Sequence, residues 1–365
     1  TLIKSEAQGN TRCVSFVDIQ VTSRRMQYVV DTLKTNKSLT TLTLDKCVVT
    51  SEGFKHLCYE LHGTSLKALR LRFIRLTALG AVVLAGKIQE CRSLKLLDLT
   101  GNPLGSWGLE SIVSALNDCD VQVLVLRRNQ FTEGKAGRIF AKLFKKHKKL
   151  ISLRILNLCR NNVGESLVEL AGSLEGTNIY TLCVGHEAYT GDVLTRSFNA
   201  LKGNHTLTVL CLPACNMDDS SLEALCEAIP FMCLEVLDLA RNQLTDTGFV
   251  KLAQTLENNY TMKQVNLEIN HGITDEGCDE ALPLLKRHLS LMLFSIGPQS
   301  FSLSREKIQE MDDAMECLSS NRTKILVLFC SLKQPTSVAS SAQIRMLPVD
   351  LYQYLSTFLC PCDCS

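Results

Sequence analysis

The sequence lacks the features that mark a membrane protein, a secreted protein or an enzyme of a familiar type. None of its apolar runs reaches the roughly 18 residues that a membrane-spanning helix needs. The opening residues, TLIKSEAQGN, have neither an apolar core nor a cleavage site, so no secretory signal is visible. There is no glycine-rich phosphate loop, no HExxH, no GxSxG and no CxxC pair. We therefore expect no transmembrane segment, no catalytic residue and no cofactor.

The chain also lacks a strong net charge. Its 39 basic and 37 acidic side chains leave a formal charge of +2 over 365 residues. A protein that binds nucleic acid through its overall field carries a large positive excess. The composition therefore argues against nucleic acid as a partner.

One internal period dominates what is present. The segment LEVLDLARNQL, which starts at Leu234, has the spacing LxxLxLxxNxL. The segments LKLLDLTGNPL and LRILNLCRNNV repeat it. Successive frames start 25 to 32 residues apart, which is typical of a solenoid. Eleven frames are readable when substitutions are allowed, with starts at Val14, Leu39, Leu66, Leu94, Val121, Leu153, Ile179, Leu207, Leu234, Met262 and Leu291.

A second signal follows most frames at a fixed offset. Apolar residues spaced i, i+3, i+4 and i+7 form one face of an amphipathic helix, as in Phe54, Leu57, Cys58 and Leu61. The xLxL portion predicts a short strand whose leucines point into the core, and the helix returns on the outer side. Because a helix is wider than a strand, the stack must curve, with parallel strands on its concave face. The asparagine of NxL is expected to bond backbone groups where the chain leaves the strand.

This double pattern resembles the ribonuclease-inhibitor-like subclass of leucine-rich repeats over roughly residues 13–330. The resemblance implies an α/β fold, a horseshoe-shaped solenoid of about 11 repeats with helices on its convex face, which usually binds proteins. We expect residues 1–12 to be the leader of a truncated N-terminus and ILVLFC at 325–330 to be an incomplete repeat. Residues 331–345 should form a polar linker, and residues 346–365 a C-terminal helix with a cysteine-rich tail.

The 17 cysteines fit the repeats better than they fit disulfides. Cys183 and Cys211 share the fifth frame position, so we expect them to be neighbours about 5 Å apart in adjacent strands. A thiol-rich metal site there is the alternative to plain free thiols, but no ligand spacing supports it. Reduced cysteines favour a reducing compartment, the cytoplasm. Five others are expected to be small buried side chains in asparagine slots or helix faces: Cys47, Cys215, Cys58, Cys226 and Cys278.

The outward positions of the predicted strands form the candidate binding surface. Its middle is rich in arginine, whose planar fork pairs with carboxylates and stacks on aromatic rings. A solvated wall without a partner is the alternative, and Asp98 offers a local ion pair. Later repeats turn acidic or apolar, with Glu268 and Met292–Leu293. We predict binding of a protein with an acidic segment through Arg70, Arg72, Phe73, Arg127, Arg128, Arg154 and Arg160.

Three further segments carry secondary hypotheses. The basic run KLFKKHKKL at 142–150 offers a contact for anionic lipid, although most such runs are only solvated. The terminal CDCS is a poor match to a prenylation box because Asp363 replaces an aliphatic residue. LPVDLYQYLSTFL at 347–359 is similar to the opening helix of an F-box, so a ubiquitin-ligase adaptor is the alternative function, and a capping helix is the plainer account. Repeats with F-box-like fragments are typical of bacterial effectors acting in host cytoplasm; a eukaryotic scaffold or inhibitor is the alternative source.

Overall fold

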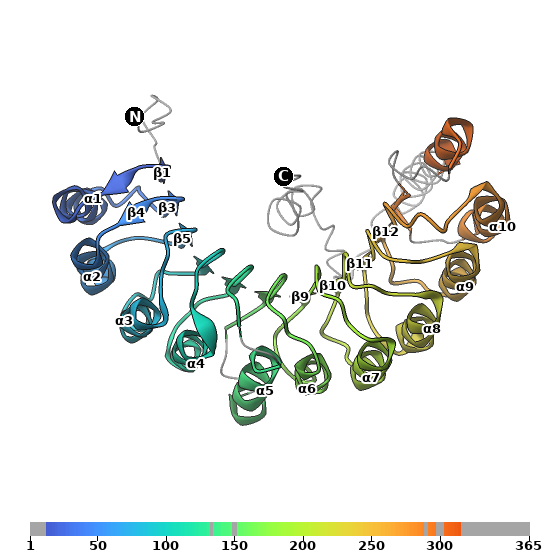
Figure 1. Cartoon of the computed structure of the whole chain (residues 1–365), viewed down its shortest axis with the longest axis horizontal. Helices are drawn as coiled ribbons and strands as arrows, with labels where there is room; N and C mark the ends of the chain where they lie inside the picture. Colours follow the sequence, from blue (N-terminus) through green and yellow to red (C-terminus); the bar gives the residue numbers. More distant parts are fainter. Residues whose placement is uncertain (1–11, 132–133, 148–151, 288–290, 297–302, 315–365) are drawn as a thin grey trace, which may run out of the picture.

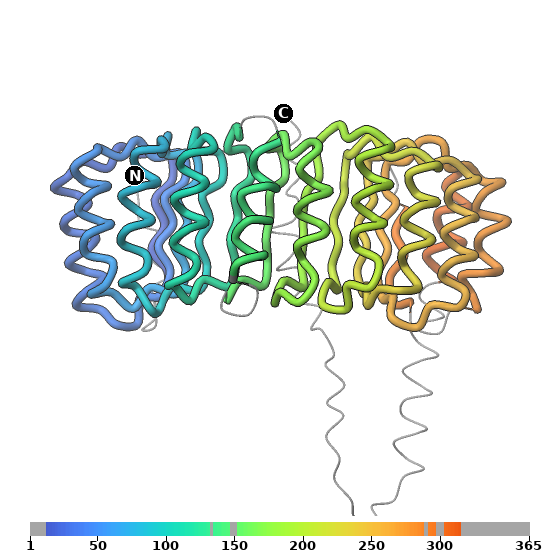
Figure 2. Tube along the Cα trace, turned by 90° about the horizontal axis from the view of Figure 1, so that it is seen from below, coloured from blue at the N-terminus to red at the C-terminus, as the bar shows by residue number. Residues whose placement is uncertain are grey.

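The computed structural model describes residues 12–131, 134–147, 152–287, 291–296 and 303–314. In these residues short strands alternate with helices, and the chain forms an arc with strands on its inner side and helices on its outer side (Figure 1). From below, the helices stand side by side along the arc (Figure 2). The predicted solenoid is confirmed. The segments 325–330, 331–345 and 346–365 lie outside the described residues, and so do 1–11.

The strands of the main sheet are parallel, and from the second frame onward each begins at the third position of its leucine frame. Eleven described strands form it, matching the eleven frames, and two-residue strands β2 (Gln20–Val21) and β4 (Val48–Val49) pair separately. In sheet order the eleven are β1 (Cys13–Val17), β3 (Thr41–Asp45), β5 (Ala68–Arg72), β6 (Leu96–Asp98), β7 (Val123–Val125), β8 (Ile155–Asn157), β9 (Thr181–Cys183), β10 (Val209–Cys211), β11 (Val236–Asp238), β12 (Gln264–Asn266) and β13 (Leu293–Ser295).

The helices follow the strands on the convex side. A further helical stretch covers 305–314. The named helices are α1 (Ser23–Thr35), α2 (Ser51–Glu60), α3 (Ala78–Ile88), α4 (Gly105–Ala115), α5 (Ala136–His147), α6 (Ser166–Ser173), α7 (Gly191–Leu201), α8 (Asp219–Ala228), α9 (Asp246–Glu257) and α10 (Asp275–Leu285).

The register of the sheet follows the leucine frame, with one correction. Leu97 pairs with Leu69 on one side and Leu124 on the other, so equivalent frame positions are neighbours. Val14, however, pairs with Leu42, the fourth position of its frame. The predicted frame start at Val14 is therefore wrong by three residues. The first frame position of that repeat is residue 11, which is a polar threonine. A search for an apolar first position therefore begins the frame three residues too late, at Val14.

The inward leucines form a continuous core between strands and helices. Leu97, Leu156 and Leu237 have no exposed surface, as predicted. The core cluster runs from Val21 in the first repeat to Ala314. Each repeat buries its apolar side against its neighbours, which is why a solenoid needs no central core.

Asparagines at the ninth frame position join each turn to the preceding repeat. Asn102 Nδ2 donates to the carbonyls of Leu71 (2.7 Å) and Leu99 (2.8 Å), while its Oδ1 accepts from the N–H groups of Ile74 and Leu76. These bonds satisfy backbone groups that would otherwise be buried without partners. Asn129, Asn161, Asn242 and Asn270 donate in the same way, and Cys47 and Cys215 do occupy this slot, as predicted.

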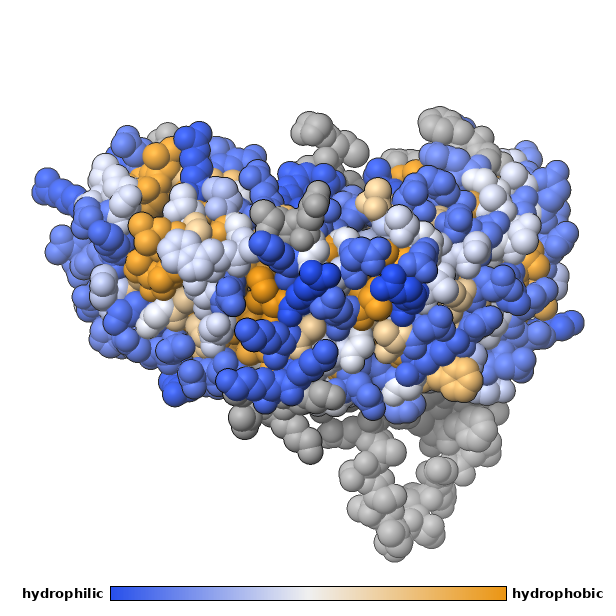
Figure 3. Space-filling view, turned by 60° about the horizontal axis from the view of Figure 1, so that its bottom comes forward, coloured by the Kyte–Doolittle hydropathy of each residue, from blue (hydrophilic) through white to orange (hydrophobic). Residues whose placement is uncertain are grey.

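The outer surface is predominantly hydrophilic, with apolar patches mainly toward the N-terminal end (Figure 3). Lys142, Lys145 and Lys146 are exposed on α5, and residues 148–150 of the basic run lie outside the described part. Within the described ranges, no helix has both the length and the apolar character to cross a membrane.

Candidate functional site

The side chains at the third frame position form an apolar surface along the concave face. Third-position residues pair across seven consecutive strands, and only Thr181 is polar among them. With fifth-position neighbours such as Val125, Cys183 and Cys211 they form clusters separate from the main core, and their side chains are mostly buried. The third-position series is Ala68, Leu96, Val123, Ile155, Thr181, Val209 and Val236.

The predicted partner-binding residues do not share one environment. Arg154 and Arg160 are exposed, whereas Arg70 and Arg128 are partly buried. Arg127 is only 9% exposed, so the prediction that its guanidinium projects from the concave wall is wrong. Arg127 is at the seventh frame position, beyond the end of β7. Its charge, like burial, lowers the pKa of His186, and it opposes the rise that burial causes in the pKa of Cys159; these two residues belong to the next two repeats. Its side chain therefore lies over neighbouring turns instead of in solvent.

Arg72 and Phe73, also predicted to bind a partner, are engaged within the fold. Arg72 Nε lies 2.5 Å from Asp98 Oδ2, and the Asp98 side chain is almost fully buried. A Cβ atom on Gly101 would come within 2.2 Å of the Phe73 ring, so that ring lies directly over the glycine. Gly101 has φ +72°, which favours glycine on conformational grounds as well. These two residues fix neighbouring turns to each other.

From β7 to β11 a row of mostly polar side chains occupies the eighth frame position, where the chain turns out of each strand. Arg128, Arg160, His186, Ala214 and Arg241 all have φ between 52° and 61°. The N–H of each donates to the next repeat, as in Arg160 to the carbonyl of Gly185 (3.1 Å). The row is therefore in register, with a strand spacing of about 4.8 Å between members. We call Arg128, Arg160 and Arg241, together with Arg127 beside them, the arginine row.

A hollow of about 420 Å³ opens on this row. Arg160 Nη2 lies 3.4 Å from His186 Nδ1 at its edge. Burial, followed by the charges of the four arginines, lowers the pKa of His186 to about 4. The imidazole is therefore neutral at pH 7. Residues that line the hollow are Arg160, His186, Glu187, Ala188, Ala214, Asn216, Arg241 and Gln243.

Glu187 is the one carboxylate among the lining residues, and the fold uses both of its oxygens. It occupies the asparagine slot of its repeat, and its oxygens accept from the N–H groups of Asn161 (2.8 Å) and Val163 (2.5 Å). Burial raises the pKa of Glu187. Sequence reasoning missed this role, although the position within the frame could have revealed it.

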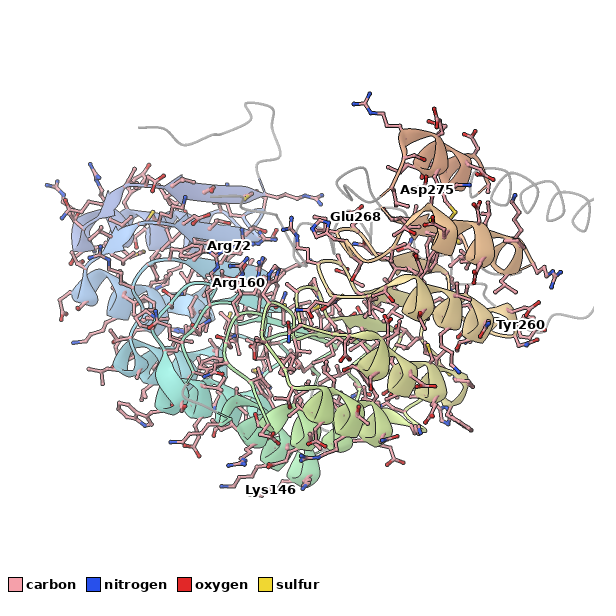
Figure 4. The ribbon with its side chains drawn as sticks, turned by 45° about the vertical axis from the view of Figure 1, so that its right-hand side comes forward. Arg72, Lys146, Arg160, Tyr260, Glu268 and Asp275 are labelled. Carbon is pink, nitrogen blue, oxygen red and sulfur yellow. The ribbon has the colours of Figure 1, made fainter. Side chains whose placement is uncertain are left out.

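The charge of the concave face changes along the arc. Arg72 and Arg160 lie on its inner side, Glu268 lies on the C-terminal arm, and Lys146 lies at the outer surface (Figure 4). Glu268 accepts from the Ser295 hydroxyl at 2.7 Å. Burial, opposed in part by the N–H of Ala240, raises the pKa of Asp238 to about 6. The structure thus has a cationic centre followed by an acidic arm.

The cysteines of this face are neighbours, as predicted. Cys183 and Cys211 are direct partners in the pairing of β9 with β10, and both are buried. All cysteines in the described ranges are free. In the same ranges no group of three or more His, Cys, Asp or Glu side chains is arranged to hold a metal ion.

Comparisons with known proteins match this architecture. The family described as Leucine Rich repeat matches residues 90–113 and 232–253. The chain is 25% identical to NACHT, LRR and PYD domains-containing protein 3 of Mus musculus, over 86% of this chain and 30% of that protein. It is 24% identical to the ribonuclease inhibitor of Sus scrofa, over 83% of this chain and 70% of that protein. The chain thus spans less than a third of the NACHT protein's length.

A solved structure has the same fold. A chain in the crystal structure of the Rad7 and Elc1 complex in yeast superimposes with a TM-score of 0.52 at 19% identity, covering 80% of this chain and 76% of that one. The protein is therefore a leucine-rich-repeat solenoid, a class whose members bind other proteins and typically have no catalytic activity. Within that class its sequence is similar to the ribonuclease inhibitor and to NACHT and LRR proteins.

Proposed function

We propose that this protein binds a protein partner on its concave face, through an acidic segment of that partner, and catalyses no reaction. The observation that carries the proposal is the arginine row, in which Arg128, Arg160 and Arg241 stand on in-register turns along one edge of the face. One relative is named an inhibitor, and inhibition is a binding function. Arginine is a frequent anchor in interfaces because its planar fork pairs with carboxylates.

The distribution of charge favours one orientation of the partner. Arg160 is exposed and Arg128 partly so, while Glu268 is on the C-terminal arm. An acidic segment would bind over β7 to β9 and would be repelled toward β12. Carboxylates of an extended segment can match guanidinium groups spaced by one or three strand separations, about 5 or 14 Å.

The reducing cytoplasm is part of this proposal. Its support is that the described cysteines are free and, apart from Cys13 and Cys233, buried. The ligase-adaptor hypothesis stays a prediction because residues 347–359 lie outside the described ones. The bacterial-effector hypothesis also stays a prediction, since the relatives named above are mammalian.

Reversal of charge in the row tests the proposal. We expect Arg128→Glu with Arg160→Glu to abolish capture of the partner from cell lysate. The matched control is Arg138→Glu on the convex side, an exposed arginine paired with Glu169. Capture by the native protein should also weaken as salt rises, because exposed charges are screened within about 8 Å at physiological ionic strength. Capture that survives both the reversal and high salt would place the site elsewhere, with exposed Met292 and Leu293 as the next candidate.

A further inference from the structure

We propose that the hollow beside Ala214 holds a phosphorylated side chain of the partner, a phosphoserine or phosphothreonine, between Arg160 and Arg241. This inference rests on the proposed function and names the chemistry of the acidic group that the partner presents. It assigns roles to His186 and Arg241, neither of which the sequence pattern placed in the site.

The shape of the hollow comes from one small residue in the row. Ala214 stands between His186 and Arg241, where its neighbours in the row have long or bulky side chains. Arg160 and Arg241 line the hollow from β8 and β11, three strand spacings or about 14 Å apart. Guanidinium groups that reach inward from both sides can each present two parallel N–H donors to the same tetrahedral group.

Two guanidinium groups, those of Arg160 and Arg241, line the hollow together with one carboxylate, that of Glu187. All four arginines of the row act on His186, so their charges converge on that point. Glu187 is held in place by the N–H groups of Asn161 and Val163 and contributes at most one negative charge. A phosphorylated side chain carries about 1.5 to 2 negative charges at pH 7 and three acceptor oxygens. It therefore matches the row better than one aspartate or glutamate does.

Arg127 supplies an independent observation. Its side chain is nine-tenths buried, and its Nε has no hydrogen-bond partner among the described residues. A buried donor without an acceptor is unfavourable, and a buried guanidinium needs a nearby negative charge. Arg127 does not line the hollow, so a dianion bound beside His186 would act on it through the field and not by a hydrogen bond.

His186 gives the site its own reporter. The imidazole is neutral because burial, and then the charges of four arginines in the turns after β7, β8 and β11, lower its pKa: Arg160, Arg127, Arg241 and Arg128. Glu187 is the next residue in the same turn as His186. A bound dianion cancels much of this positive field. The pKa of His186 must therefore rise when the hollow is filled, whichever molecule carries the phosphate.

The first experiment uses the full chain and inorganic phosphate at constant ionic strength, with chloride as the reference salt. We expect the NMR titration of the His186 imidazole to move up by at least one pH unit in phosphate. Arg160→Gln and Arg241→Gln should each weaken the phosphate response at least tenfold. Arg138→Gln, which removes an exposed guanidinium from the convex side, should leave it unchanged. Circular dichroism checks that each variant is folded. No movement of His186 in phosphate, or equal movement in the glutamine variants, overturns the proposal.

The second experiment separates a protein-borne phosphate from a free one. A short alanine peptide with a central phosphoserine should bind at least tenfold more tightly than the same peptide with serine or glutamate. Free phosphate that binds while the phosphopeptide does not would overturn the assignment to a phosphorylated partner. The two proposals fail separately. If charge reversal abolishes capture but His186 does not respond to phosphate, the proposed function stands and the phosphate proposal fails. If His186 responds to phosphate but charge reversal leaves capture unaffected, the proposed function fails.

Discussion

Arg72 and Asp98 form an ion pair between neighbouring strands β5 and β6, with Nε 2.5 Å from Oδ2. Asp98 also accepts from the N–H and hydroxyl groups of Thr100, at 3.0 and 2.6 Å. One arginine of the predicted binding surface is therefore held by the fold. Arg72 is thus held by Asp98, whereas Arg128, Arg160 and Arg241 around His186 are the arginines that we propose for partner binding.

This pair gives the first prediction. Asp98→Ala leaves Arg72 without its counter-ion and Thr100 without an acceptor, so the free energy of unfolding should fall by about 2 kcal/mol or more. A double-mutant cycle with Arg72→Ala in urea should give a coupling energy of roughly 1–3 kcal/mol. Two substitutions whose effects simply add would show that the pair contributes nothing beyond its separate contacts.

The leucine frame predicts the cost of an inward truncation. Leu237 is fully buried between strands and helices, so Leu237→Ala should lower the free energy of unfolding by roughly 2–5 kcal/mol. Leu79→Ala on α3 is the matched control, because Leu79 is 65% exposed. Chemical denaturation of both variants measures the difference. A loss below about 1 kcal/mol for Leu237→Ala would mean that its frame position does not face the core.

Asp238 predicts a dependence of stability on pH. Its pKa in the folded protein is about 6, above its ordinary value of 3.8. Between these values the folded state binds more protons than the unfolded state, so stability falls as pH rises through this window. At pH 7 the charged carboxylate costs up to about 3 kcal/mol. Asp238→Asn retains an acceptor for the Ala240 N–H, so it should raise the melting temperature at pH 7 and have little effect at pH 4.

His186 titrates with the opposite sign and must be separated from Asp238. Its pKa is lowered to about 4, so its contribution to stability rises with pH between about 4 and its ordinary value of 6.5. His186→Gln removes that rise and leaves the Asp238 contribution. Melting curves of both variants across pH 4 to 8 assign each slope. If Asp238→Asn has the same dependence of melting temperature on pH as the wild type, Asp238 is not the buried carboxylate that causes it.

The thiols predict a graded reactivity. Burial raises the pKa of the Cys183 thiol, and hydrogen bonding with Cys183 together with burial raises that of Cys211. The thiolate is the nucleophile, so both should alkylate far more slowly than exposed Cys13 in the folded protein. Under denaturing conditions without reductant, all 17 cysteines should titrate as free thiols. A markedly lower count would contradict the reducing-compartment proposal.

The strands and their register could be predicted because each depends on local periodicity. Leucines at fixed spacing specify which side of a strand is buried, and Leu237 is fully buried as expected. Thr11, a polar residue in the first frame position, produced the one register error. The asparagine slots were also readable from spacing. The frame position of Glu187 was readable too, but its role was missed because glutamate does not match the residue type of the pattern.

The candidate site was less predictable, because it depends on how neighbouring turns pack. Arg127 was expected to face solvent from its frame position alone, yet it lies over the adjacent repeats. Arg241 is distant in sequence from the arginines of the earlier repeats, so no local pattern joins it to Arg160. Only the register of the turns brings both to one hollow.

The asparagine slot allows a reciprocal test of the turn contacts. Asn242 Nδ2 donates to the carbonyls of Leu212 and Leu239, and its Oδ1 accepts from Cys215 and Met217. Asn242→Cys removes the strong donor and the acceptor together, so it should lower the free energy of unfolding by about 1–3 kcal/mol. The reverse change, Cys215→Asn, should raise it by about 1 kcal/mol, because the weak donor Cys215 Sγ lies 3.6 and 3.9 Å from the carbonyls of Pro213 and Val184, whereas an amide would donate at normal distance. Both changes lie in adjacent turns of the same face, and urea denaturation compares them directly. Equal destabilisation by both would show that the Cys215 turn has repacked around sulfur and that the two slots are not equivalent.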